Sequence, residues 1–266
     1  MNNNNRKDII FFLLVCFGWS WFFWIVEIVA GIKLYAGPWG PLVAAFAVKW
    51  RREGKSGILG LLSSAVIYKG TKKWLFPVLL IMPVAAGLSY LLTGMAGEEI
   101  PISKAFSRPW IILTNFIYIL FLGGPLQEEF GWRGFLLPAL QKKYNALSSS
   151  VLLGIIWAIW HFPLNFTPDN AGPQYIAAVQ MLAGSVIMMI LLSVIFTWIY
   201  NNTEGSILMA LLLHTMLNLS AYVIFPVFET KTGPGLFMLI LLILSVTILI
   251  FYGKNHLVRT KIYHTK

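Results

Sequence analysis

The sequence has few charged residues and a single cysteine. Only 11% of its 266 residues are charged, against about 25% in soluble domains, which excludes an ordinary soluble fold. Cys16 has no second cysteine to pair with, so the chain carries neither a disulfide framework nor a thiolate metal site. Negative charges are scarcer than positive ones, with ten acidic residues against 20 basic residues. The basic residues lie at the ends of apolar runs and form no basic and aromatic face, so we expect no nucleic acid partner.

What the chain has instead is long apolar runs, and 58% of its residues are hydrophobic. Such runs indicate membrane-spanning helices, because only helices and closed barrels satisfy their backbone groups in lipid. We predict an all-α, multi-pass protein of the cell membrane, a single transmembrane helical domain over residues 1–266 in contact with membrane lipid. The eight expected spans cover residues 9–32, 39–48, 74–92, 110–144, 148–162, 175–200, 206–223 and 236–252.

Two spans depart from a simple helix. The fourth is too long for one straight span at about 1.5 Å per residue, and it contains Gly123, Gly124 and Pro125, so we predict a kink there. The second is short and ends in a basic cluster at residues 49–55. The segment 58–68 after it is either a helix that lies on the cytoplasmic surface against anionic lipid or an ordinary loop.

The basic residues predict the orientation of the chain. With the N-terminus inside, only Lys33, Lys104, Arg108 and Lys231 of the 20 basic residues fall outside. The other basic residues, Arg133 among them, fall on the cytoplasmic side, which is the asymmetry of the positive-inside rule. Both termini should therefore be cytoplasmic.

Glu128, His161 and His214 share one depth in the membrane. Counted from the cytoplasmic ends of their helices they lie about 21, 20 and 18 Å in, at 1.5 Å per residue. An ionised group at bilayer depth costs at least about 2.5 to 3.5 kcal/mol, so such groups persist mainly in a protein interior or a wet cavity. We expect the three side chains to face one another around an intramembrane site, in a cavity open towards the cytoplasm.

Helical spacing separates the two adjacent carboxylates. Glu129 and Arg133 are four residues apart and can pair on one face, whereas Glu128 points about 100° away and is the freer base. His214 and Asn218 are also four apart, and imidazole and amide donors can stabilise an oxyanion. Taken alone, the carboxylate cluster is equally typical of an interfacial ion pair, and a lone membrane histidine is often a packed residue.

Three motifs at these positions resemble the CAAX protease and bacteriocin-processing (Abi) family of intramembrane endopeptidases, which includes the CAAX prenyl endopeptidases. Its patterns Glu-Glu-x-x-x-Arg, aromatic-x-x-x-His and His-x-x-x-Asn are matched by Glu128, Glu129 and Arg133, by Trp157 and His161, and by His214 and Asn218. The resemblance covers roughly residues 110–223, the expected catalytic core. Trp157 stands where the family more often has phenylalanine, and the larger ring should preserve the wall beside His161.

The resemblance implies a protease that hydrolyses a peptide bond within the membrane. Glu128 would activate water with help from His161, while His214 and Asn218 would bind the oxyanion. Glu129 and Arg133 would be structural support, as Trp157 is for His161. The substrate would be a protein or peptide, either a CAAX-type C-terminus, which is prenylated in some relatives, or a peptide of bacteriocin leader processing or immunity.

The sequence leaves the cofactor open. Glu128, His161 and His214 form a donor set that a divalent metal such as Zn²⁺ accepts, as in a metalloprotease. The H-E-x-x-H spacing of common zinc proteases is absent. A metal-free, glutamate-dependent mechanism resembles the same residue set equally well.

Two other functions are compatible with the same residues. A proton- or cation-coupled transporter would bind its ion at Glu128 and Glu129, and helix breaks at residues 31–38 and 123–125 are typical of discontinuous transporter helices. An inactive family member would act as an immunity or scaffold protein, although its intact motif residues argue against that.

Overall fold

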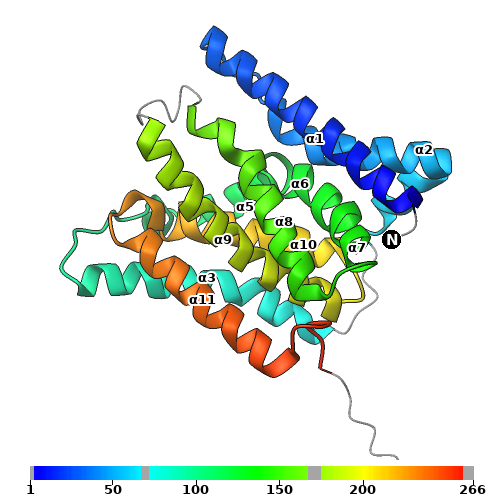
Figure 1. Cartoon of the computed structure of the whole chain (residues 1–266). Coiled ribbons are helices and arrows are strands. Elements are labelled where there is room, and N and C mark those ends of the chain that lie inside the picture. The colour runs from blue at the N-terminus through cyan, green and yellow to red at the C-terminus, as the bar shows by residue number, and fades with distance from the viewer. Residues whose placement is uncertain (1–2, 67–71, 167–174, 260–266) are drawn as a thin grey trace, which may run out of the picture.

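The computed structural model describes residues 3–66, 72–166 and 175–259, and every regular element within these ranges is a helix. The predicted all-α class is confirmed. The longer helices are α1 (Asn3–Ala30), α2 (Gly40–Ser63), α3 (Leu75–Met95), α5 (Trp110–Leu122), α8 (Ala146–His161), α9 (Tyr175–Asn202), α10 (Ile207–Asn218) and α11 (Gly233–Tyr252), and the shorter ones are α4 (Lys104–Ser107), α6 (Pro125–Gly131) and α7 (Leu137–Gln141). In Figure 1, α1 and α2 lie together on one side of the bundle, and α3 and α11 lie together on the other.

The protein is a multi-pass membrane protein. Six helices in the described ranges are long and apolar enough to cross a membrane, and a bent helix pair makes a seventh span if it counts as one. The predicted count of eight is not confirmed, because α2 is not among these spans. The middle of α2 carries Lys49, Arg51, Arg52, Glu53 and Lys55, whose charges make a full apolar span impossible.

Helix α2 nevertheless extends well beyond the short span that the sequence predicts. Its backbone leaves the helical region at Gly54, where φ is 62°, a left-handed value that glycine adopts without a steric penalty. The helix then continues to Ser63, so the first part of the segment at residues 58–68 is helical rather than a loop. The end of that segment lies outside the described residues.

The predicted kink in the fourth span is present. Helices α5 and α6 are bent by about 40° relative to each other, and Gly124 between them has a φ of 112°. Pro125 occupies the first turn of α6, where its missing N–H costs no hydrogen bond. The chain then continues through a π-helical turn, η3 (Trp132–Leu136), into α7.

Close packing of α8 against α9 fixes one wall of the bundle. A side-chain carbon added at Gly154 of α8 would come within 2.6 Å of the backbone of Ile190, so the two helices touch at the glycine. Small residues serve this purpose in membrane helices, where close backbone approach replaces the hydrophobic effect as a source of packing energy.

Several segments predicted to be cytoplasmic meet at one end of the bundle, which we call the basic end. Asn5 near the start of α1 donates through Nδ2 to the carbonyl of Ala139 at 3.0 Å, and Asp8 forms ion pairs with Arg51 and Arg52 of α2. The backbone N–H of Ala146, at the start of α8, donates to the carbonyl of Asn255, which follows α11, at 2.9 Å. The basic residues in these and the adjoining segments are Arg6, Lys7, Lys49, Arg51, Arg52, Lys55, Lys72, Lys73, Lys142, Lys143, Lys254 and Arg259.

The opposite end, which we call the far end, is formed by the loops at the other helix termini. Glu98, after α3, accepts hydrogen bonds from the backbone N–H groups of Lys231 and Thr232, just before α11. The hydroxyl of Ser103 donates to the carbonyl of Val223 at the end of the α10 segment. The four basic residues expected outside, Lys33, Lys104, Arg108 and Lys231, lie in or beside these loops. Which end faces the cytoplasm stays a prediction.

Candidate active site

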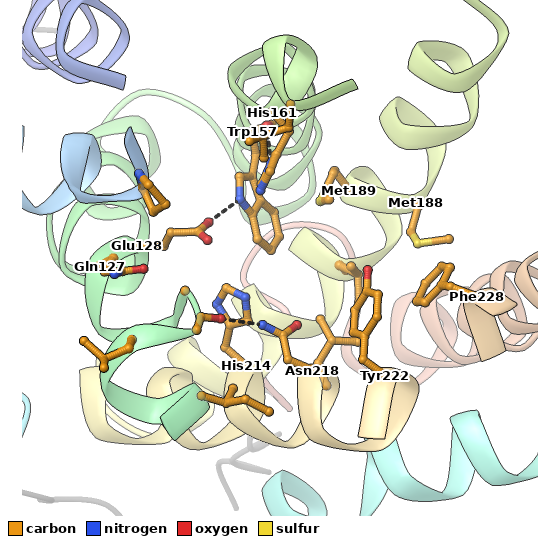
Figure 2. A pocket seen from close by; sticks show the side chains of 18 of the residues that line it. Gln127, Glu128, Trp157, His161, Met188, Met189, His214, Asn218, Tyr222 and Phe228 are labelled. Carbon is orange, nitrogen blue, oxygen red and sulfur yellow. Dashed lines mark hydrogen bonds between the residues drawn. The ribbon is translucent and has the colours of Figure 1, made fainter. Parts of the chain in front are cut away.

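Glu128 lies in α6, one turn after Gly124, and is only 5% exposed. Its Oε2 accepts a hydrogen bond from the indole Nε1 of Trp132 at 3.1 Å and another from that of Trp157 at 2.7 Å. Figure 2 shows the carboxylate pointing from α6 towards Trp157, with His214 and Asn218 on the neighbouring helix. Because both donors are neutral, the carboxylate is held in place without a direct hydrogen bond from a cation.

Glu129 has a different set of partners. Both of its carboxylate oxygens accept from Nη1 of Arg133, at 2.9 and 3.0 Å, as the four-residue spacing predicts. Oε1 also accepts from Nδ1 of His214 at 2.7 Å. The Glu129 carboxylate therefore connects Arg133 on its own helix segment to the imidazole on α10.

Arg133 is fully buried, so its expected place on the cytoplasmic side is wrong. Its guanidinium lies 4.1 Å from the ring centroid of Phe196 and 4.8 Å from that of Trp157. The Glu129 carboxylate and the negative faces of the two aromatic rings offset the free energy of hydration that the buried Arg133 guanidinium loses. Arg133 contributes to the interior of the bundle and not to its orientation in the membrane.

The hydrogen bonds of the two histidines define their tautomers. Nδ1 of His161 lies 2.9 Å from the carbonyl oxygen of Trp157, one turn earlier on α8, and Nδ1 of His214 lies against the Glu129 carboxylate. A carbonyl or a carboxylate oxygen can only accept, so each Nδ1 carries a hydrogen. The Nε2 atoms are then the nitrogens left for chemistry.

Asn218 and Gly124 complete the arrangement. Nδ2 of Asn218 donates to the carbonyl of Gly123 at 3.0 Å, which ties α10 to the break between α5 and α6. A side-chain carbon added at Gly124 would lie 3.0 Å from Oε1 of Glu128, 3.6 Å from Nδ2 of Asn218 and 3.8 Å from Nε2 of His214. These three polar atoms therefore surround one point beside Gly124.

These side chains line a cavity of about 610 Å³ (Figure 2). Glu128, Trp157, His161, His214 and Asn218 form part of its wall, whereas Glu129 and Arg133 do not. The motif residues thus divide into a group that reaches the cavity and an ion pair that lies behind it. Much of the rest of the wall comes from segments towards the far end, and the expected opening towards the cytoplasm stays a prediction.

The arrangement does not fit a metal ion. Within residues 3–66, 72–166 and 175–259, no three His, Cys, Asp or Glu side chains are grouped so that they could hold one. Within the donor set Glu128, His161 and His214, Oε2 of the carboxylate already accepts hydrogen bonds from two indoles. We therefore derive no step through a metal.

Three residues of the site were missed by the sequence reasoning. Trp132 lies inside the first motif, and its four-residue spacing from Glu128 was a usable signal for a hydrogen bond. Gln127 is 3% exposed and lines the cavity, and its Oε1 has no hydrogen-bond partner in the described part of the chain. Phe196, which covers Arg133, comes from α9 and has no signal in the local sequence.

Comparison with known proteins finds the same segment. Residues 109–220 match the family model described as Type II CAAX prenyl endopeptidase Rce1-like. Over 159 residues the chain is 33% identical to CAAX prenyl protease 2 of Methanococcus maripaludis, and the match covers 58% of this chain and 58% of that relative. The predicted resemblance to the CAAX prenyl endopeptidases is confirmed for this segment, which contains every motif residue.

Proposed function

We propose that the chain, whose residues 109–220 match the CAAX prenyl endopeptidases, is an intramembrane endopeptidase in which Glu128 activates the hydrolytic water. The observation that carries this proposal is the convergence of Glu128, His214 and Asn218 around Gly124, beside His161, on the wall of one cavity. A carboxylate, an imidazole and two candidate hydrogen-bond donors are the groups that general-base hydrolysis of an amide uses.

In the first step, the Glu128 carboxylate takes a proton from water while the water oxygen attacks the carbonyl carbon of the scissile bond. His161 assists by accepting a hydrogen bond from the same water through Nε2, which is unprotonated in the neutral ring because Nδ1 carries the hydrogen. The carbonyl oxygen becomes an oxyanion. The proton on Glu128 then passes to the amide nitrogen, the C–N bond breaks, and a carboxylic acid and an amine leave.

His214 and Asn218 are placed to bind the oxyanion. The amide of Asn218 has two N–H hydrogens and spends one on the carbonyl of Gly123, which leaves the second for the substrate. Nε2 of His214 donates when the ring is an imidazolium. That charge balances the buried cluster, because Glu128 and Glu129 then carry two negative charges against the positive charges of Arg133 and His214.

The name of the relative makes a prenylated CAAX peptide the first substrate to test. The cavity wall includes Met188, Met189, Leu192 and Phe237, which suit an apolar segment of a peptide or its lipid group. Processing of a bacteriocin leader, which the sequence resemblance also allows, stays a prediction about the same chemistry. We also propose the cell membrane as the location. Residues 1–266 form one helical domain in this proposal, with its catalytic core at 110–223. Contacts between distant parts of the chain, of Asn5 with Ala139 and of Ala146 with Asn255, support the single domain.

The test is the Glu128→Gln variant, reconstituted in lipid vesicles and assayed by mass spectrometry for cleavage of a prenylated CAAX peptide. We expect cleavage to fall by about 10² to 10⁴, the usual contribution of a general base. Glu53→Gln on the charged part of α2 is the matched control and should keep the wild-type rate. Full activity in Glu128→Gln would overturn the proposal, as would a wild-type protein that moves ions without cleaving any peptide.

A further inference from the structure

A groove between α1 and α2 lies near the basic end, outside the cavity that contains Glu128, and the two hollows share no lining residue. We propose that this groove binds one anionic phospholipid of the surrounding membrane, with its phosphate at Arg51 and an acyl chain against the apolar wall. The proposal goes beyond the proposed function and does not depend on it.

The bend of α2 forms this hollow, which we call the interfacial groove. Its volume is about 720 Å³. Gly54, with its left-handed φ of 62°, separates two parts of α2, and residues from both parts line the groove together with one residue of α1. These lining residues are Phe11 on α1, Phe46, Ala47, Trp50 and Arg51 before the bend, and Ile58 after it.

Helices α1 and α2 run antiparallel up to the groove. A side-chain carbon added at Gly40, at the start of α2, would clash with Oγ of Ser20 in the second half of α1. Further along α2, Arg51 pairs with Asp8 near the start of α1 at 2.6 Å. Residues of α2 that precede Arg51 therefore lie deeper in the bundle than Arg51 does.

The groove presents its groups in the order of those in a phospholipid. Phe11 lies about 4.5 Å deeper than Asp8 along α1, and Phe46 about 7.5 Å deeper than Arg51 along α2, at 1.5 Å per residue. The headgroup region of a bilayer extends about 5 to 8 Å beyond the hydrocarbon core on each side. With Arg51 at the level of the phosphates, the two phenyl rings are at the level of the acyl chains. Trp50 is 60% exposed beside Arg51, as is typical of tryptophan at a membrane interface.

Arg51 has positive charge and N–H groups left for a ligand. Its Nη2 donates to Oδ1 of Asp8 at 2.6 Å, but Oδ2 of the same carboxylate accepts from Nε of Arg52, also at 2.6 Å. Two guanidinium groups thus share one negative charge. Glu53 is paired with Lys49 at 3.0 Å. A guanidinium has five N–H donors, and the Arg51 side chain is 50% exposed, so donors remain for the oxygens of a phosphate.

The contact of Arg51 with Phe11 holds its guanidinium at the rim of the groove. The guanidinium carbon lies 4.5 Å from the centroid of the Phe11 ring, a distance at which the ring face attracts a cation. The same aromatic ring therefore orients the charged group and lines the apolar wall. One ligand that contacts both must carry a negative charge next to an apolar chain.

Charge complementarity favours a lipid over a second copy of this chain. The acidic residues in these parts of α1 and α2 are Asp8 and Glu53, and the basic residues are Arg6, Lys7, Lys49, Arg51, Arg52 and Lys55. Two such basic surfaces would repel each other across a symmetric interface. Clusters of basic residues beside membrane helices attract anionic lipid headgroups.

The interfacial groove also adjoins the helix that carries the carboxylates. The ring of Phe46 lies 6.2 Å, between centroids, from that of Phe130, which follows Glu129 in α6. A lipid in the groove should hold α2 against α6. Because a ligand that binds the folded state stabilises it by mass action, the bound lipid should raise the melting temperature.

Native mass spectrometry of the purified full chain in detergent tests the proposal. Phosphatidylglycerol and phosphatidylcholine with identical acyl chains are titrated, separately, into wild type and three variants. Arg51→Gln removes the charge and leaves Asp8 paired with Arg52. Ala47→Phe fills the groove without a change of charge. Lys143→Gln is the matched control, because Lys143 is an exposed basic residue that does not line the groove.

We expect wild type to bind one phosphatidylglycerol more tightly than phosphatidylcholine. Arg51→Gln and Ala47→Phe should each bind phosphatidylglycerol at least about fivefold more weakly, which for Arg51 is the usual contribution of one basic residue to binding of an anionic lipid. Lys143→Gln should bind as wild type does. Added phosphatidylglycerol should raise the melting temperatures of wild type and Lys143→Gln more than those of the two groove variants.

Equal weakening in Arg51→Gln and Lys143→Gln would show a general attraction of charge and overturn the site. Unchanged binding in Ala47→Phe would show that the lipid lies elsewhere. A dimer mass in place of a lipid adduct would assign the groove to a second copy, and displacement of the lipid by inorganic phosphate would assign it to a free anion. Melting temperatures without added lipid show whether each variant is folded, and either groove variant tests the site by itself. None of these measurements uses cleavage, so they stand apart from the test of Glu128→Gln.

Discussion

Two neighbouring glutamates show how far single residues determine this site. The four-residue spacing correctly predicts that Glu129 pairs with Arg133 and that Glu128 points elsewhere. The sequence does not predict that His214 binds Glu129, because this contact joins residues 85 positions apart on different helices. Counting residues from the helix ends shows that His214 and the two glutamates lie at about the same depth in the membrane. Only the packing of α10 against α6 decides which glutamate His214 contacts.

Replacing Arg133 by methionine should destabilise the protein strongly. The side chain has about the right length but no charge, so Glu129 would keep only His214 as a partner in a fully buried place. Breaking a buried ion pair from one side costs about 3 to 5 kcal/mol. Thermal unfolding in detergent checks this, with Arg108→Met in the exposed far-end loop as the control. Equal melting temperatures for the two variants would show that the buried pair contributes nothing to stability.

Asn218→Ala should lower kcat by about 10² to 10³ with little change in KM, because its second N–H is proposed to bind charge that develops in the transition state. Asn115→Ala is the matched control, since Asn115 lines the same cavity but bonds to the carbonyl of Ile111 in its own helix. Steady-state kinetics on the same peptide gives both constants. A rise in KM at unchanged kcat would assign Asn218 to ground-state binding instead.

At the scale of secondary-structure elements, the sequence predicts where a helix is interrupted better than how far a helix extends. The kink at residues 123–125 follows from two glycines and a proline, whose backbone preferences are local. Local propensity does not encode the extension of α2 through Gly54 or the two π-helical turns, η3 and η5 (Leu219–Ile224). In α2, the ion pair between Asp8 of α1 and Arg51 holds the part of the helix before Gly54. Both π-helical turns directly follow segments that carry site residues.

Gly124→Ala should damage both stability and activity. Its φ of 112° is a left-handed value that costs a residue with a side chain about 1 to 3 kcal/mol, and the added carbon would lie 3.0 Å from Oε1 of Glu128. Melting temperature and cleavage rate should therefore fall together. Gly184→Ala, a helical glycine in α9 with open space around it, should leave both nearly unchanged. Wild-type cleavage in Gly124→Ala would mean that the kink does not position the base.

At the scale of the whole molecule, the sequence predicts which segments share an end of the bundle. Alternating spans bring the start of α1, the end of α7 and the start of α8 together, and the contacts of Asn5 and Ala146 bear this out. The side on which the cavity lies was not predictable in the same way. It depends on which side of the Glu128 carboxylate, towards the basic end or towards the far end, is filled by large side chains such as Trp132. That follows from three-dimensional packing.

Stability in acid should depend on Glu98, which links α3 to α11 at the far end. Hydrogen bonds from the backbone N–H of Lys231 and from Thr232 lower the pKa of this carboxyl group below its usual value. A lowered pKa in the folded state means that the stabilisation is complete above the ordinary carboxyl pKa and is lost as the pH falls through the lowered one. The melting temperature of Glu98→Gln should thus lie below wild type at neutral pH and converge with it in acid.

The control for this effect is Glu99→Gln, a neutral replacement at the exposed neighbouring position. It should melt close to wild type at every pH. A difference between Glu98→Gln and wild type that stays constant from neutral to acid would contradict the link between this carboxylate and the loop before α11.

The two indoles that hold Glu128 bind only one of its two carboxylate oxygens. Trp132 and Trp157 both donate to Oε2, and an indole N–H can never take a proton back. Oε2 is thus saturated by donors. In the proposed mechanism the proton taken from water therefore goes to Oε1, the oxygen nearest Gly124. The two oxygens of the carboxylate, which are chemically equivalent in a free glutamate, then have different roles, because only Oε1 has room for the proton.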